Sequence, residues 1–271
     1  MNQLLRIGSN TQANLALRNL YRVNNKVAMH QERLSTGKRI NSAKDDAAGF
    51  ALATSLKERL SGMRVAKQNI QNAQSILSIV EAGQQKSIDL LQDMREKLLR
   101  VQDSTLTTDQ RKSVLDQLGE LKSELTDIYN SVKWNSSTPI PGTTISFQVG
   151  EESTDTFAVT TSMVQGSTFA SFASTSATAS VADITAIDNH IKNAISYAQS
   201  TGSKIGRLSN KFDSMTTRIA TTESVRSTIE DADFAEEQME LIKSQIMQQT
   251  ATAALSQANT APQIVLQLFQ S

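Results

Sequence analysis

The stretch Met63–Val80, MRVAKQNIQNAQSILSIV, decides the fold class of this chain of 271 residues. Its apolar residues recur alternately three and four positions apart, at Met63, Ala66, Ile70, Ala73, Leu77 and Val80. This spacing places them on one stripe of an α-helix that packs lengthwise on a partner. The stripe continues through Leu56, Leu91, Met94, Leu98 and Val101. The sequence therefore predicts one helix of about 60 residues, roughly 90 Å long.

The same spacing recurs in three further segments, 13–34, 114–132 and 184–219, which are also predicted to be helices. His30 is the one polar residue on the first stripe. Because no second histidine, cysteine or carboxylate cluster accompanies it, we interpret it as a packing residue and assign it no catalytic role.

Helix ends are indicated by capping residues. Gly37 is expected to end the first helix, and Ser42 with Asp45 forms the pattern of a capping box that begins the long helix. Thr107 with Gln110 is a second such pattern and begins the third helix.

The helical pattern stops between residues 136 and 180, where 20 of 45 residues are Ser or Thr and none is Lys or Arg. Apolar residues alternate at 145–149 and again at 157–159, on either side of a polar turn, which predicts a β-hairpin. We expect the whole of 136–180 to lie on the surface, because its polar composition offers little to a packed core, and about 165–180 to be a low-complexity loop. The predicted fold is mainly α, an elongated antiparallel helical bundle or coiled coil with one small β-hairpin.

Composition excludes several functional classes. The chain has no cysteine and two histidines, which argues against a thiolate or histidine metal site, and no nucleotide-binding, esterase or metalloprotease motif occurs. No run of 18 apolar residues is present, so no membrane span is expected. We therefore predict no enzyme activity, no cofactor and no metal.

Charge and tail composition point to contacts between the two ends of the chain and with other proteins. Residues 1–44 carry 8 basic and 1 acidic side chains, whereas residues 223–245 carry 7 acidic and 2 basic ones, which favours pairing of the two ends. Residues 246–271 carry no charge and mix amides with apolar side chains. Such a tail suits a protein partner better than a bilayer.

Several stretches resemble bacterial flagellin. These are ERLSTGKRINSAKDDAAG at 32–49, IEDADF at 229–234 and ANTAPQIVLQLF at 258–269, and TISFQVGEESTDTFAV at 144–159 is similar to a hairpin of the family. Together with the intervening helices, the resemblance covers about residues 1–135 and 182–271. The segment between them is short, so the chain resembles a near-minimal flagellin without large outer domains.

The resemblance implies a structural subunit that self-assembles into the extracellular flagellar filament for motility. It implies an inner coiled-coil domain made of 1–42 and 223–271, and a rod domain made of 43–135 and 182–222, with 136–181 as the hairpin and Ser/Thr-rich surface segment. The implied partners are further copies in a helical homo-polymer, hook-associated and cap proteins, and an export chaperone. Export would use the flagellar secretion system.

Candidate site residues fall into three groups. For subunit contacts we select Leu20, Val27, Leu34, Gly37, Arg39, Ile40, Asp45, Asp46, Ile264, Val265, Leu266, Leu268 and Phe269. For the lining of a central channel, which the resemblance implies for the last helix, we select Gln245, Gln248, Gln249, Gln257 and Asn259.

The third group concerns an immune receptor. In flagellins detected by Toll-like receptor 5, a basic residue and a leucine flank a V-R-E core. In the similar stretch LQDMREKLL at 91–99, Arg95 and Glu96 match that core, but Asp93 replaces the basic residue and Lys97 the leucine. The resemblance therefore implies weak receptor activation.

Two other functions are weighed against the filament subunit. A hook-filament junction protein shares the terminal-helix design and a similar length. A nucleic-acid-binding coiled coil would use the basic N-terminal block, but zero net charge and a single Trp count against it.

Overall fold

The computed structural model describes residues 10–135, 140–168 and 181–270, with side chains placed except at 168, 181–182 and 261–270. The helices are α1 (Thr11–Thr36), α2 (Ala47–Val101), α3 (Thr108–Ser131), α4 (Val181–Glu230) and α5 (Phe234–Gln270). Strands β1 (Thr144–Gln148) and β2 (Thr156–Thr160) pair antiparallel, and η1 (Gly166–Thr168) is a short 3-10 helix. The predicted mainly helical fold with one hairpin is confirmed.

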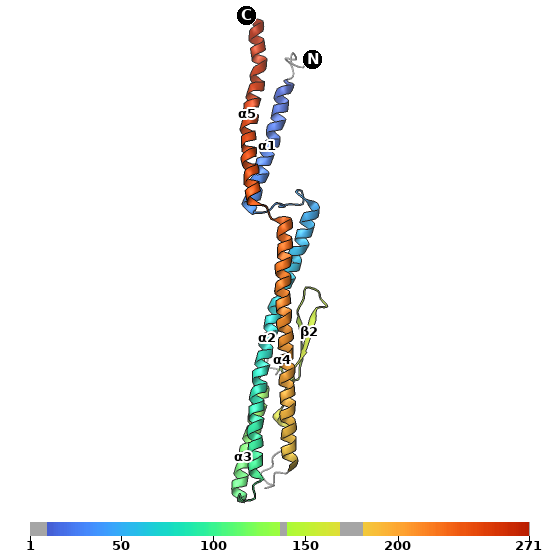
Figure 1. Ribbon diagram of the computed structural model, residues 1–271, viewed down its shortest axis with the longest axis vertical. Helices are drawn as coiled ribbons and strands as arrows, with labels where there is room; N and C mark the ends of the chain where they lie inside the picture. The colour runs from blue at the N-terminus through green and yellow to red at the C-terminus, as the bar shows by residue number, and fades with distance from the viewer. Residues whose placement is uncertain (1–9, 136–139, 169–180, 271) are drawn as a thin grey trace. The chain divides into compact units, whose positions relative to one another are not determined.

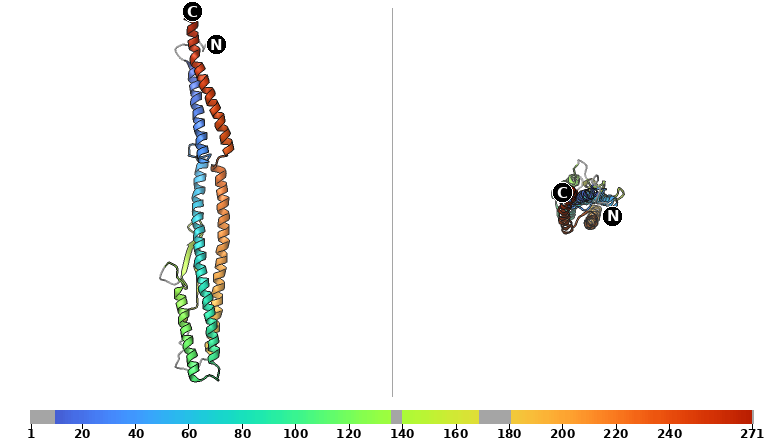
Figure 2. Two further views of the ribbon diagram at one scale, coloured as in Figure 1. Left: turned by 90° about the vertical axis from the view of Figure 1, so that its left-hand side faces the viewer. Right: turned by 90° about the horizontal axis from the view of Figure 1, so that it is seen from above.

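The chain divides into two compact units. The terminal unit runs to Glu58 and resumes at Thr221, and it contains α1 and α5. The central unit is 59–220 and contains α3, the hairpin and most of α2 and α4. Within the central unit, α3 lies beside α2 in both views of Figures 1 and 2.

The predicted stripes form the core of the central unit. One apolar cluster joins α2, α3 and α4 and includes Leu91, Leu98, Leu118 and Ile187, each fully buried. A second cluster joins α2 and α4 to the hairpin. Two polar residues of α2 are also buried: the Gln84 amide donates to the carbonyl of Ser162 at 2.8 Å, and the Ser87 hydroxyl donates to the carbonyl of Gly83.

The hairpin is packed against the central helices. Phe157 and Val159 of β2 are buried, and the turn between the strands carries Glu151, whose Oε1 accepts hydrogen bonds from Arg59 of α2 at 2.8 Å and Arg218 of α4 at 2.9 Å. These contacts hold the strand pair on α2 and α4.

The prediction that 136–180 offers little to a packed core is wrong for 140–164. The apolar residues of this stretch that are buried are Ile140, Val149, Phe157, Val159, Met163 and Val164. A serine- and threonine-rich strand can still bury its alternate apolar residues, since period-two alternation needs only one apolar residue in two. Residues 136–139 and 169–180 of this segment lie outside the described residues.

Capping explains where the helices begin and end. α3 begins with the predicted capping box of Thr107 and Gln110. α1 ends at Gly37, as predicted, in a left-handed conformation with φ of 71° that glycine adopts without strain.

The predicted start of α2 is wrong. Asp45 does bond to Ser42, but it closes a turn before the helix, because its carboxylate accepts from the backbone N–H groups of Asn41 and Ser42. The carboxylate that caps α2 belongs to Asp46, which accepts from Ala48 and Gly49, and the helix begins at Ala47.

Candidate assembly interface

The site of interest is the helix pair of the terminal unit. Helices α1 and α5 lie side by side in Figures 1 and 2. The Asn10 amide donates to the carbonyl of Ala258, the Gln248 amide donates to Asn24 Oδ1 at 2.8 Å, and His30 meets Glu237. Low residue numbers on α1 thus face high numbers on α5, so the two helices run antiparallel.

The inside of this pair is polar where it is most buried. Among the described side chains of α1 and α5, the buried ones are His30, Glu237 and Ser244. The predicted seam of α1 does face α5, but its apolar members, including Leu20, Val27 and Leu34, are only half-buried. A pair of helices alone therefore does not close an apolar core.

Large apolar side chains instead lie on the outside of the pair. On α1, Leu17 and Tyr21 are 37% and 62% exposed. On α5, the exposed apolar residues are Phe234, Met239, Ile242 and Ile246. These outward residues were not predicted from the sequence. Their signal was present as a second apolar row at 239, 242 and 246, spaced three and four apart, which predicts a helix with two buried faces.

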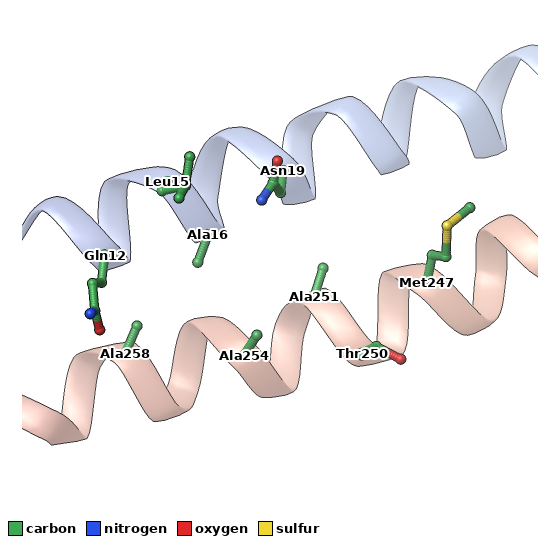
Figure 3. A pocket seen from close by; sticks show the side chains of 9 residues that line it. All are labelled: Gln12, Leu15, Ala16, Asn19, Met247, Thr250, Ala251, Ala254 and Ala258. Carbon is green, nitrogen blue, oxygen red and sulfur yellow. The ribbon is translucent and has the colours of Figure 1, made fainter.

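A groove opens between the two helices, as Figure 3 shows. Its volume is about 550 Å³. It is lined by Gln12, Leu15, Ala16, Asn19, Met247, Thr250, Ala251, Ala254 and Ala258. The four alanines are too short to fill the space between the backbones, so the groove stays open and mostly apolar.

A buried charged cluster lies near the opposite end of the pair. His30 Nδ1 lies 2.5 Å from Glu237 Oε2, and Arg33 donates to Glu237 Oε1 at 2.9 Å. Burial alone would raise the pKa of Glu237, but the hydrogen bonds from His30 and Arg33 outweigh it and lower that pKa. His30 is thus buried, as expected of a packing residue, yet it packs through a hydrogen bond to a carboxylate 207 positions away.

The segments that connect the helices are also paired. The N–H groups of Arg39 and Ile40 donate to the carbonyl of Glu230, and the N–H of Ala232 donates to the carbonyl of Gly37. The Arg39 guanidinium donates to the carbonyl of Ile229 at 2.8 Å, and Ile40 is buried.

The Glu230 carboxylate pairs with two basic side chains in the same region. They are Lys38 and, at 2.5 Å, Arg226. Burial opposes ionisation, but the hydrogen bonds and charges of Lys38 and Arg226 lower the pKa of Glu230. The predicted pairing of the basic N-terminal block with the acidic block is confirmed by this contact and by Arg33 with Glu237.

Comparison with known proteins identifies the family. Residues 7–143 match the bacterial flagellin N-terminal helical region, and residues 184–269 match the bacterial flagellin C-terminal helical region. The chain belongs to the bacterial flagellin family. It is a structural subunit of the flagellar filament, and neither the junction protein nor the nucleic-acid-binding coiled coil is favoured.

The relatives match over nearly their whole length. Flagellin of Listeria monocytogenes is 31% identical over 261 residues, which cover 89% of this chain and 91% of the relative. Flagellin of Bacillus subtilis is 27% identical, with 98% and 100% covered, and the flagellar filament 33 kDa core protein of Treponema phagedenis is 27% identical, with 97% and 99% covered.

The residues predicted to line a central channel lie on α5. The exposed ones are Gln245, Gln249, Gln257 and Asn259, whereas Gln248 is half-buried against α1 and donates a hydrogen bond to Asn24. Ile264, Val265, Leu266, Leu268 and Phe269 lie in the helical end of α5, but their side chains are outside the described set. No described helix is long and apolar enough to cross a membrane.

The receptor segment lies on α2 in the central unit. Asp93 and Glu96 are exposed, Arg95 donates to Asp188 of α4 at 2.6 Å, and Lys97 donates to Gln117 of α3 at 2.7 Å. Two of the four side chains are therefore already engaged within the chain.

Proposed function

We propose that the helix pair of α1 and α5 is the surface through which copies of this flagellin assemble. The observation that carries the proposal is the distribution of side chains in the pair: polar residues are buried between the two helices, and large apolar residues are exposed on the outside. Each exposed apolar side chain loses contact with water when a neighbouring copy covers it. Two different surfaces of one copy, a groove and an outward apolar row, favour heterologous contacts that propagate as an open helix.

The experiment replaces the outward row on α5. Full-length Ile242→Gln/Ile246→Gln is expected to remain a folded monomer, because both side chains are about half exposed, at 48% and 58%. It should fail to form filaments by electron microscopy. Ser256→Gln, which changes an exposed polar position on the same helix, is the matched control and should polymerise. Normal filaments from the double variant would contradict the proposal.

The segment 37–49 is a second proposed contact with a neighbour. It carries three basic residues, Lys38, Arg39 and Lys44, followed by two acidic ones, Asp45 and Asp46, and charges of both signs would set the register of an interface. Because Asp46 caps α2, charge reversal there would also weaken the helix. Asp46→Asn keeps a capping side chain and removes only the charge. We expect Asp46→Asn to slow polymerisation while the thermal unfolding of the monomer is unchanged; equal polymerisation rates would oppose this contact.

The uncharged tail is proposed to line the central channel, and to be held by an export chaperone before assembly. Export would use the flagellar secretion system, with cap and hook-associated proteins as further partners at the filament ends. The absence of charge from residues 246–271 supports this role, because an uncharged polar channel wall is hydrated but does not bind passing segments of either charge. A secreted chain whose mature N-terminus lies well inside the sequence would contradict uncleaved export.

We infer a purely structural role, without catalysis, cofactor, metal or nucleic acid. Assembly by burial of apolar surface needs none of these groups, and the net charge of zero gives no general attraction to phosphate backbones. Micromolar duplex binding with a steep salt dependence would contradict the part of this inference that concerns nucleic acid.

Weak activation of Toll-like receptor 5 is proposed for the segment around Arg95. Asp93 inverts the charge expected there, and Lys97 must be desolvated on binding. Together these changes cost about 2 to 6 kcal/mol, or roughly 30-fold to 20,000-fold in potency. Asp93→Arg/Lys97→Leu should restore part of the response of reporter cells. Nanomolar potency of the unchanged monomer would overturn this proposal.

A further inference from the structure

The apolar contacts that α1 and α5 make in the groove discriminate poorly between alternative alignments of the two helices. In the groove, Ala16 faces a row of alanines at 251, 254 and 258, which repeat every three or four residues. If α5 slid by one turn, about 5.4 Å, another alanine would take the place of the first. The loss of apolar contact would be small, since alanine side chains bury little surface.

The charged cluster does discriminate. His30 and Arg33 lie one turn apart on α1 and take up both carboxylate oxygens of Glu237. A slide of one turn would move Glu237 away from both residues. In one direction it would bring Leu241 to them, which would leave the arginine and the carboxylate partly buried without partners, and this is far more costly than exposing an alanine. In the other direction it would bring Asp233, whose Oδ1 already accepts from the N–H groups of Ala235 and Glu236 at the start of α5.

The next carboxylate on the C-terminal side of Glu237 is engaged elsewhere. Glu240 lies three residues beyond Glu237, but it pairs with Lys243 of its own helix at 2.9 Å, and its side chain is 41% exposed. The pKa of Glu237 is lowered despite its burial, which agrees with a carboxylate held ionised by its two partners on α1.

We propose that Glu237, held by His30 and Arg33, sets the register of α5 against α1. These three are positioning residues, because they act through the alignment of the two helices and not through contact with a neighbour. The consequence for assembly rests on the proposed function: one register presents the apolar rows of α1 and α5 to neighbouring copies in one arrangement.

The test uses cross-linking in the full-length chain, which has no cysteine of its own. Asn24→Cys/Gln248→Cys reports the observed register, because the two native side chains are hydrogen-bonded. Asn24→Cys/Thr252→Cys reports a register one turn away. Each pair is bridged with a short bis-maleimide reagent at low protein concentration, and the intrachain product is quantified by peptide mapping.

The two pairs are compared in four backgrounds: unchanged, Glu237→Gln, Glu240→Gln and the reciprocal exchange Arg33→Glu/Glu237→Arg. Glu240→Gln is the matched control, with the same substitution one turn along the same helix. We expect Glu237→Gln to raise the shifted product relative to the native product by about fivefold or more. Glu240→Gln should leave the ratio unchanged, and the reciprocal exchange should restore it.

Other outcomes overturn the proposal. If Glu237→Gln lowers both products equally, the cluster only stabilises the pair and does not set its register. The same conclusion follows if Glu237→Gln and Glu240→Gln give the same ratio, or if neither cysteine pair reacts within one chain. Filament formation is scored separately by electron microscopy, so a failure of the assembly proposal is distinguished from a failure of the register proposal.

Discussion

The central unit and the helix pair of the terminal unit bury different kinds of side chain. In the central unit, most of the buried side chains are apolar and come from α2, α3, α4 and the hairpin. Among the described side chains of the helix pair, the buried ones are a histidine, a glutamate and a serine, while leucine, tyrosine, methionine and isoleucine face outward. The central unit thus closes its own core. The terminal pair leaves large apolar side chains exposed, and by the proposed function other copies cover them.

Removal of a terminal segment should have the largest effect. We expect deletion of 258–271, or of 1–20, to abolish filament formation, because each removes one side of the helix pair. Thermal unfolding of the central unit, followed by circular dichroism, should be unchanged. Normal filaments after either deletion would contradict the claim that assembly depends on the helix pair.

A core substitution in the central unit should act on stability in the monomer. Leu91 is fully buried between helices, so Leu91→Ala is expected to cost about 2 to 5 kcal/mol in the free energy of unfolding. Ile246→Ala on the outside of α5 should cost less than about 0.5 kcal/mol in the monomer. Denaturant titration of both monomers gives the comparison, and equal losses would contradict it.

The same two units should respond differently to acid. Glu230 and Glu237 of the terminal unit have pKa values lowered from the ordinary 4.5 by hydrogen bonds and charges that outweigh their burial. A lowered pKa in the folded state means that the stabilisation is complete above pH 4.5 and is lost as the pH falls through the lowered value.

We therefore expect filaments to dissociate below about pH 4.5 while the central unit remains helical. Light scattering and circular dichroism, followed through one acid titration, separate the two events. In Glu237→Gln the part of this acid response due to Glu237 should disappear, whereas Glu124→Gln, on the exposed face of α3, serves as the control. Simultaneous loss of both signals would argue against a difference between the units.

The smallest effect is expected from charges on the tail helix. Gln249→Lys/Gln257→Lys adds two positive charges at exposed positions of α5, away from the seam with α1. Subunits that pass through a charged channel should be retarded, so filaments should lengthen more slowly under the microscope. An unchanged elongation rate would contradict the proposal that these residues line the channel.

The sequence predicted most of the central unit because its signals are local and periodic. Each of these signals can be recognised within a few residues: the apolar stripe from Met63 to Val101, the capping box at Thr107 and the alternation of the two strands. The start of α2 was misplaced because Asp45 and Asp46 are adjacent, and only the backbone shows which carboxylate reaches the helix N-terminus.

The charged cluster of the terminal unit could not be found in this way. His30 and Glu237 are far apart in the chain, and a histidine on an apolar stripe does not indicate its partner. The outward apolar rows were missed for another reason. Heptad spacing identifies one seam, but it does not say how many partners a helix has.

Hydrogen exchange, read by mass spectrometry on monomers and on assembled filaments, tests the dependence of the terminal unit on its neighbours most directly. In monomers, the amides of α1 and α5 should exchange at least about tenfold faster than those of α2 and α3. In filaments, α1 and α5 should become as protected as the central unit. Equal protection of all four helices in the monomer, with no change on assembly, would show that the helix pair closes its own surface.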